Sequence, residues 1–213
     1  MTRRRLPPAA RRAQIIEAAR GVIVERGLAV ASLRDIAKAA DVSLGTVTYH
    51  FDGVDEILSA VVVTESERFY EDVVRAADAE PDPWRALEII VASLFGDSDD
   101  VAAHWRIWSD YWAAVARRPE MAAAYADRIR HWEACCTRVI ARGVASGTFR
   151  GVDPEVTALK LAAYSDGLGT QRAQNVEGLT AEVARTWMNE FARWLLSPDG
   201  RPAEAGHCVS REG

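Results

Sequence analysis

The sequence predicts an all-α protein of nine helices, and three observations lead to this fold class. Apolar residues recur throughout the chain at the three- and four-residue spacing of amphipathic helices. Runs that alternate polar with β-branched residues, as strands do, are nearly absent. Proline, glycine and capping residues interrupt the pattern at intervals that suit helices.

Three helices are expected in the first quarter of the chain, over residues 9–26, 32–40 and 44–51. Gly27 stands directly after the first, where a helix commonly ends in a glycine. Ser32 with Asp35 three residues later resembles a capping box and opens the second. Ser43 follows a tight turn and can cap the short third helix.

Six longer helices follow, over residues 54–77, 83–95, 100–117, 119–146, 153–175 and 180–197. Pro83, Pro119 and Pro154 each suit the first turn of a helix, and Asp153 supplies an N-cap. After residue 197 the sequence is rich in Pro, Gly, Ala and Glu and loses its periodicity. We therefore expect residues 198–213 to form a disordered tail.

The length of 213 residues favours a small domain joined to a larger one. A hydrophobic fraction of 49% with 27% charged residues excludes a disordered or fibrous chain. No apolar run approaches the roughly 20 residues that span a bilayer, and the N-terminus lacks a signal-peptide pattern. Three cysteines make no even disulfide set, so we expect a cytoplasmic protein with reduced thiols.

The charge of the chain is unevenly placed. The net charge is −5, which by itself argues against a nucleic-acid partner. Residues 1–51, however, hold nine arginines and lysines against four acids, a net +5, and the remaining residues carry −10. A protein with a basic head and an acidic body can approach phosphate only through the head. The alternative is that the excess positive charge of residues 1–51 is no more than a basic tail.

Residues 32–51 have the length and pattern of a helix-turn-helix, in which the second helix enters the DNA major groove. Apolar side chains within it can form a small core: Ile36, Ala37, Ala40, Val42 and Val47. Polar side chains that suit phosphates and base edges remain outside: Ser43, Thr46, Thr48, Tyr49 and His50. Composition alone leaves open a plain helical hairpin with a polar surface.

Residues 33–51, with the sequence LRDIAKAADVSLGTVTYHF, resemble the signature of TetR-type transcriptional regulators. The upstream segments IIEAA (residues 15–19) and ERG (residues 25–27) are similar to the first helix of that family. The resemblance covers residues 9–75 and implies a nine-helix homodimer, a two-fold symmetric operator and a ligand pocket in the C-terminal body. The residues that it implies at the DNA face are Ser32, Arg34, Ser43, Thr46, Thr48, Tyr49 and His50. We also expect Leu44 and Gly45, at the start of the third helix, to lie at this face.

Two positions depart from the family pattern. Thr48 stands where many members have a tyrosine, and Val54 stands where many have a lysine. Both usual residues would touch phosphate, so each departure removes a contact. We expect Arg3, Arg4 and Arg5 to compensate as a flexible arm in the adjacent minor groove. The departures also favour an alternative, an all-α small-molecule-binding protein with weakened or lost DNA binding.

The most informative stretch of the body is an aromatic stripe. Residues 101–115 place three tryptophans on one helix face, which is either packed core or the wall of a pocket for a cation or a flat hydrophobic effector. The segment HWRIWSDYW (residues 104–112), with DGL at residues 166–168, resembles the betaine-responsive regulators of the same family. The predicted ligand-binding residues are Phe69, Trp84, Phe95, His104, Trp105, Trp108, Asp110, Tyr111, Trp112 and Trp132.

The last two predicted helices carry small residues beside large apolar ones, which suits either a dimer face or ordinary internal packing. A short recognition helix reads few bases, and a dimer doubles that number, so we expect a dimer. The predicted interface residues are Leu161, Ala162, Ser165, Leu168, Gly169, Trp187, Phe191, Trp194 and Leu195.

No pattern supports an enzyme. The four histidines lack metal-ligand spacing, and there is neither a glycine-rich phosphate loop nor a G-x-S-x-G motif, so no metal or cofactor is expected. Cys135 and Cys136 point about 100° apart on one helix, so we expect one of them to be a buried thiol.

The sequence thus predicts a ligand-responsive DNA-binding regulator, a homodimeric repressor released from a palindromic operator by a small organic effector. Its expected parts are a basic flexible arm (1–8), a helix-turn-helix domain (9–54, extending into the next helix to about residue 75), a ligand-binding and dimerisation domain (55–197) and the tail (198–213).

Overall fold

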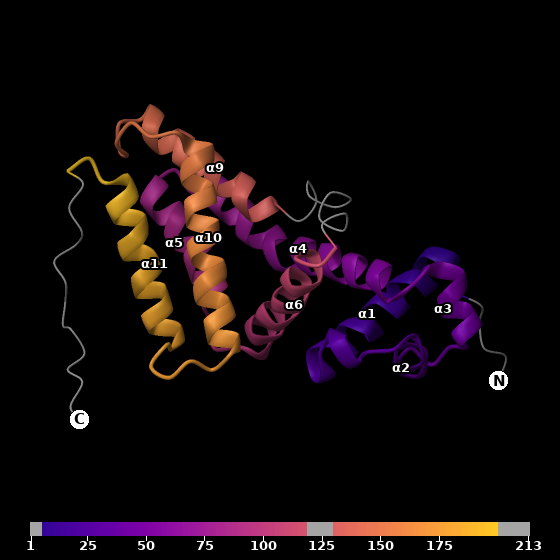
Figure 1. Cartoon of the computed structure of the whole chain (residues 1–213). Coiled ribbons are helices and arrows are strands. Elements are labelled where there is room, and N and C mark those ends of the chain that lie inside the picture. Colours follow the sequence, from indigo (N-terminus) through magenta and orange to yellow (C-terminus); the bar gives the residue numbers. More distant parts are fainter. Residues whose placement is uncertain (1–5, 119–129, 200–213) are drawn as a thin grey trace, which may run out of the picture. The chain divides into compact units, whose positions relative to one another are not determined.

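The structure, a computed structural model, describes residues 6–118 and 130–199 (Figure 1). Within these ranges it has nine α-helices, one 3₁₀ turn and no strand, which confirms the predicted all-α class. The elements are α1 (Pro8–Arg26), η1 (Leu28–Val30), α2 (Leu33–Ala39), α3 (Leu44–His50), α4 (Val54–Ala79), α5 (Pro83–Leu94), α6 (Asp99–Val115), α9 (His131–Ala145), α10 (Pro154–Ala173) and α11 (Ala181–Leu196).

The predicted helix starts are confirmed by their caps. The Ser32 side chain accepts a hydrogen bond from the Asp35 amide while the Asp35 carboxylate accepts one from the Ser32 amide, so the capping box is complete. Ser43, Asp153 and Thr180 cap α3, α10 and α11 by one half of this arrangement, in which the side chain accepts a hydrogen bond from a backbone amide of the first turn. Gly27 ends α1 with a φ of 79°, a conformation that favours glycine.

One predicted helix is wrong in its extent. The sequence pattern suggested a single helix over residues 119–146, but Arg130 is not helical and α9 begins at His131. The apolar spacing continues across this break, so periodicity could not locate it. Residues 119–129 lie outside the described residues, as do residues 1–5 of the predicted arm (1–8) and residues 200–213 of the predicted tail (198–213).

The first of two compact units contains residues 6–69, 102–118 and 130 of the described chain. Here α1 packs on α2 and α2 packs on α3. Its core is apolar and fully enclosed, with Ile15, Ile36, Val47, Phe51 and Leu58 all at most 2% exposed. This core holds the short α3 in place, since a seven-residue helix is unstable alone.

The second unit contains residues 70–101 and 131–199 of the described chain. Four helices pack in a ring: α5 on α9, α9 on α10, α10 on α11, and α11 back on α5. None of the described helices is both long and apolar enough to cross a membrane. The predicted split at residue 54 concerned functional domains and stays a prediction; the compact units divide the chain elsewhere.

Arginines from the later helices bind the carbonyl ends of the earlier ones in this second unit. Arg142 donates to the carbonyls of Ala77, Asp78 and Glu80 at 2.8–3.1 Å, at the end of α4. Arg172 donates to the Gly96 carbonyl at 3.3 Å, and Arg185 donates to the Phe95 carbonyl, both at the end of α5. Helix C-termini carry unpaired carbonyls and partial negative charge, so guanidinium groups are well matched to them.

Candidate DNA interface and effector site

The helix α3 presents a small polar surface fixed by its own N-cap. Ser43 Oγ accepts from the Thr46 amide at 3.1 Å and lies 2.8 Å from Thr46 Oγ1. Val47 faces inward and is completely buried, which leaves Tyr49 on the outside at 79% exposure. The Tyr49 ring meets the His50 ring edge to face, with centroids 5.0 Å apart. These side chains form an exposed polar surface on the outer side of α3.

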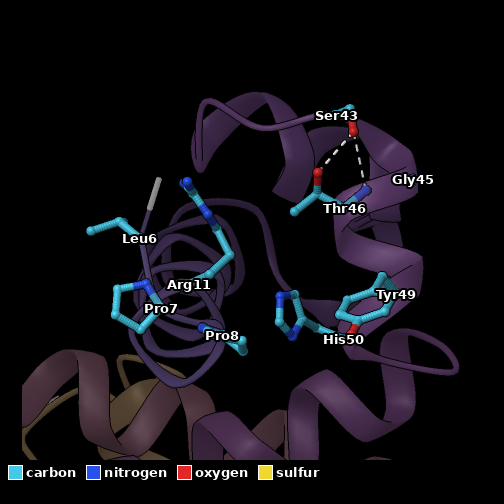
Figure 2. A pocket seen from close by; sticks show the side chains of 9 residues that line it. All are labelled: Leu6, Pro7, Pro8, Arg11, Ser43, Gly45, Thr46, Tyr49 and His50. Atoms are coloured by element: carbon cyan, nitrogen blue, oxygen red, sulfur yellow. Dashed lines mark hydrogen bonds between the residues drawn. The ribbon is translucent and has the colours of Figure 1, made fainter. Parts of the chain in front are cut away.

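The structure brings five of the predicted DNA-face residues together around one groove. They are Ser43, Gly45, Thr46, Tyr49 and His50, and Leu6, Pro7, Pro8 and Arg11 line the opposite side (Figure 2). The groove has a volume of about 760 Å³. Three other predicted residues do not line it: Ser32 and Arg34 are exposed at the start of α2, and Leu44 is 39% exposed. Arg3, Arg4 and Arg5 lie outside the described residues.

The Thr48 hydroxyl bonds within its own helix. Its Oγ1 lies 3.3 Å from the carbonyls of both Leu44 and Gly45. A threonine that bonds back to the preceding turn offers less to a phosphate than a free hydroxyl would. Thr48 therefore differs from the family's usual tyrosine in two ways: it is smaller, and its hydroxyl is already bonded within the helix.

Val54 is the first residue of α4, and the two acids that follow it are each paired with an arginine. Arg118 forms an ion pair with Asp55, and Arg12 lies 3.4 Å from a Glu56 oxygen with its guanidinium 4.5 Å above the Phe51 ring. Arg12 is one of the basic residues of the head, but its position beside Glu56 and Phe51 could not be predicted from the sequence. Two arginines therefore lie close to the start of α4, and each is paired with a carboxylate there.

A cluster of aromatic rings lines the second half of α6. Trp108, Tyr111 and Trp112 lie with ring centroids 5.3–5.6 Å apart. His104 stacks on Phe69 at 3.9 Å and meets the edge of Trp105 at 5.5 Å. The predicted stripe therefore forms one contiguous set of rings within the first unit.

Two polar atoms in this cluster are buried without a hydrogen-bond partner among the described residues, Trp108 Nε1 and Tyr111 Oη. Trp108 is 7% exposed and Tyr111 1% exposed. Burial raises the pKa of the Tyr111 phenol, so this hydroxyl keeps its proton and remains a donor. A buried donor without a partner costs about 1–3 kcal/mol, which a bound acceptor could recover.

A buried charged network adjoins the rings and was missed by the sequence analysis. Glu65 lies 2.6 Å from Arg20 Nε and 3.7 Å from His104 Nδ1, and its side chain is 2% exposed. Burial would raise the pKa of Glu65, but the contacts with His104 and Arg20 outweigh it and lower that pKa to about 2. Burial lowers the pKa of His104. The network is a carboxylate–arginine pair beside a neutral imidazole.

The remaining predicted ligand residues have other surroundings. Asp110 accepts a hydrogen bond from the Leu28 amide at 2.8 Å, so its carboxylate anchors the turn after α1. Trp84, Phe95 and Trp132 belong to the second unit. There the Trp84 ring packs on Phe149 at 4.7 Å, and Trp132 is buried with its Nε1 unpartnered among the described residues.

Comparison with known proteins identifies both halves of the chain. Residues 15–61 match the family of bacterial regulatory proteins of the tetR type, and residues 83–197 match the C-terminal family of BetI-type transcriptional repressors. The second match alone covers more than half of the chain. The chain belongs to the TetR family of transcriptional regulators, with a BetI-type C-terminal part.

The TetR-family relatives include regulators called BetI. The chain is 38% identical to the HTH-type transcriptional regulator BetI of Stenotrophomonas maltophilia over 113 residues, which is 53% of this chain and 58% of that relative. It is 29% identical over 197 residues to BetI of Burkholderia mallei, covering 88% of this chain and 94% of that protein.

Two solved structures share the TetR-family fold. A transcriptional regulator from Saccharomonospora viridis in complex with choline has a TM-score of 0.78 at 24% identity, covering 88% of this chain and 98% of that one. A TetR-family regulator from Rhodococcus has a TM-score of 0.77 at 22% identity, covering 89% and 100%. The family assignment confirms a DNA-binding, ligand-responsive transcriptional regulator, and a regulator rather than an enzyme.

The residues predicted for a dimer face of this TetR-family protein fall into two groups. Five are buried inside the single chain, where a second chain could not reach them: Leu161, Ser165, Leu168, Gly169 and Leu195. They share helices with the surface residues, and helical spacing does not tell which face meets the core and which meets solvent. The exposed members are Trp187 (46%) and Trp194 (49%), with Ala162 and Phe191 half-buried.

Both cysteines of α9 are buried, whereas the sequence analysis expected one. The helix packs against both α5 and α10, so its enclosed surface is wide enough for two adjacent positions. Burial, with a smaller contribution from Asp78, raises the pKa of the Cys135 thiol to about 11, and burial raises the pKa of the Cys136 thiol well above its usual range. A thiol in this state is a poor nucleophile and a poor redox sensor. Among the residues described, no cluster of three or more His, Cys, Asp or Glu side chains could hold a metal ion.

Proposed function

We propose that this regulator is a cytoplasmic homodimeric repressor that binds a palindromic DNA operator and leaves it when a small organic cation binds the rings of α6. The observation that carries the proposal is the aromatic cluster with two buried donors that have no partner among the described residues. The DNA part rests on α3 and the groove beside it.

The chemistry of the ring cluster selects the class of effector. Faces of tryptophan and tyrosine attract an alkylammonium group through the ring quadrupole. Trp108 Nε1 and Tyr111 Oη are donors, so they call for an acceptor on the same molecule, such as a hydroxyl or a carboxylate. Choline and glycine betaine have this combination, and a structural relative was solved with choline.

The release mechanism is a shift between two conformations. An effector weakens DNA binding only by binding more tightly to the conformation whose recognition helices are wrongly spaced. Asp110 lies on α6, between Trp108 and Tyr111 in the sequence. Its carboxylate accepts a hydrogen bond from the amide of Leu28, which lies four residues before the N-cap of α2. A change in α6 would therefore reach the helix-turn-helix through this bond.

The dimer is supported by exposed apolar stripes on α10 and α11. On α10, Val156 and Leu159 are 49% and 51% exposed at a spacing of three. On α11, Trp187 and Trp194 are 46% and 49% exposed, and the ring of Phe191 between them stacks on Trp194 with centroids 5.8 Å apart. Adjacent helices with such stripes are typical of protein interfaces, and a second copy provides the matching face that a two-fold operator requires.

DNA binding is tested with a duplex selected from random sequence by the protein itself. Selection should yield a palindrome whose half-sites lie one helical turn apart, roughly 34–36 Å. Failure to select any duplex at low salt would favour the alternative of a ligand-binding protein that has lost its DNA function. A truncation lacking residues 1–5 tests the arm: it should weaken binding, and unchanged affinity would reject a contribution from Arg3, Arg4 and Arg5.

Effector binding is tested by tryptophan fluorescence and by release of that duplex. Choline and glycine betaine should change the fluorescence and release DNA, whereas 3,3-dimethylbutanol, the uncharged counterpart of choline, should bind at least tenfold more weakly. Equal binding of the uncharged compound would reject the cation site. Replacing Trp108 by leucine should abolish release without changing DNA affinity in the absence of effector.

The oligomeric state is tested by sedimentation. The protein should sediment as a dimer at micromolar concentration, and Trp187→Glu together with Trp194→Glu should give a folded monomer with much weaker operator binding. A wild-type monomer at that concentration would reject the dimer.

A further inference from the structure

The groove lies between the start of α1 and α3. The residues of its α1 wall were not among the residues predicted to contact DNA. Arg11 lines it together with Leu6, Pro7 and Pro8, opposite the recognition helix (Figure 2). The volume of about 760 Å³ is large enough to admit part of a ligand or of a DNA strand.

The Arg11 guanidinium is held in place by a short relay. Arg11 Nη1 donates to Gln14 Oε1 at 2.7 Å, and Gln14 Nε2 donates to the Ala40 carbonyl at 2.8 Å. Ala40 is the C-cap of α2, so the relay ties the arginine to the helix-turn-helix itself. Fixing the long side chain in advance lowers the entropy lost when it binds a partner.

The charge of Arg11 has no counter-ion in the described part of the chain. Neighbouring arginines of α1 do have carboxylates nearby: Arg12 has Glu56 at 3.4 Å, and Arg20 has Glu65 at 2.6 Å. Arg11 bonds only to the neutral amide of Gln14, and a guanidinium has five N–H donors. The remaining donors are available to an anion in the groove.

The other groups around the groove suit a sugar-phosphate strand. Leu6, Pro7 and Pro8 give an apolar surface of the kind that packs against deoxyribose, and Tyr49 and His50 offer polar ring atoms on the far side. The hydroxyls of Ser43 and Thr46 are engaged with each other and with the cap of α3, which leaves Arg11 as the charged group of the site. The groups around the groove therefore fit the DNA backbone as the partner.

We propose that this groove seats a phosphate and the adjoining sugar of the operator strand, with Arg11 as the phosphate ligand and Gln14 as the residue that positions it. The inference rests on the operator binding proposed above and adds to it a contact outside the helix-turn-helix. Phosphate contacts fix the orientation of the protein on the duplex without selecting sequence. Arg11 therefore sets affinity equally for all duplexes, whereas α3 sets the choice among them.

The test measures affinity for the selected duplex and for an unrelated duplex over a range of salt. Arg11→Ala should weaken binding to both about tenfold and lower the log–log salt slope by roughly 0.9 for each lost phosphate contact, which is twice that per dimer. Arg75→Ala is the matched control, because it removes the same charge from an exposed position on α4 (67% exposed). Unchanged affinity and slope for Arg11→Ala, or an equal loss for Arg75→Ala, overturns the proposal. A wild-type protein that selects no duplex contradicts operator binding instead.

Gln14 is tested by a double-mutant cycle. Gln14→Ala should weaken DNA binding severalfold in the wild-type background and should have no effect in the Arg11→Ala background. A loss that persists without Arg11 means that Gln14 acts only through α2 and overturns its positioning role.

A measurement on the DNA side does not depend on how the variants fold. Methylphosphonate linkages, which remove one phosphate charge at a time, should identify a position in each half-site that weakens the wild type. At that position the Arg11→Ala protein should show no further loss. Equal losses in both proteins at every position overturn the assignment.

Discussion

Replacing Glu65 by glutamine should destabilise the protein by about 3 kcal/mol at pH 7. The carboxylate is buried and lies 2.6 Å from Arg20, whose side chain is only 15% exposed, so glutamine removes the negative charge that pairs with a largely buried arginine. The contacts with His104 and Arg20 overcome the effect of burial and lower the pKa of Glu65 from 4.5 to about 2. This difference corresponds to about 3 kcal/mol of folding free energy.

The sign of the pH dependence follows from proton binding. The folded chain holds fewer protons at Glu65 than the unfolded chain between pH 4.5 and 2. The stability contributed by the carboxylate is therefore complete above pH 4.5 and is lost as the pH falls toward 2. By pH 3 the difference between wild type and Glu65→Gln should have shrunk by about 2 kcal/mol.

Urea denaturation at one fixed protein concentration measures the effect, because a dimer's stability depends on concentration. The midpoint of Glu65→Gln at pH 7 should fall by about 1 M. Glu71→Gln is the control: this carboxylate lies on the same helix, 3.5 Å from Arg75 but 77% exposed, and its loss should cost less than about 1 kcal/mol. A Glu65→Gln protein within 1 kcal/mol of wild type at pH 7, or a difference equally large at pH 3, would refute the reasoning.

Three further predictions concern the second unit. Burial and a neighbouring carboxylate raise the pKa of Asp166 to about 6, so the charged form weakens the fold as the pH rises through 6. Asp166→Asn should therefore raise the stability at pH 8 by up to about 3 kcal/mol and leave it unchanged near pH 3, which urea midpoints at the two pH values will measure. A Cβ at Gly143 would lie 2.1 Å from the Phe149 ring, so Gly143→Ala should destabilise by about 1–3 kcal/mol despite the better helix propensity of alanine, and a higher thermal midpoint would contradict this packing. Once the third cysteine is replaced by serine, the two buried thiols of α9 should react with a disulfide reagent at pH 8 only after unfolding, and labelling of the native protein would show that the helix opens.

Local features of the head could be predicted from the sequence because their causes are local. The Ser32–Asp35 capping box and the Ser43 cap involve side chains and amides three residues apart. The inward position of Val47 and the outward position of Tyr49 follow from helical periodicity over seven residues.

The relays that hold the candidate sites could not be predicted, because they join distant parts of the chain. Gln14 bonds to the Ala40 carbonyl 26 residues away, and Arg20 bonds to Glu65 across 45 residues. One signal was present: Glu65 lies three residues after Val62 and seven after Leu58, on the apolar stripe of α4. A carboxylate in such a stripe indicates a buried partner, though it does not say which one.

The arginine bonds at the ends of α4 and α5 bear on how fast the protein unfolds. Arg142 reaches Ala77 across 65 residues, and Arg185 reaches Phe95 across 90. Bonds that close loops of this length form late, after the local helices have formed and packed. Removing them should therefore speed unfolding more than it slows folding. The bonds of a few guanidinium groups should therefore slow the unfolding of the four-helix ring by the full factor that they add to its equilibrium stability, and slow unfolding protects a regulator in a cell that degrades unfolded chains.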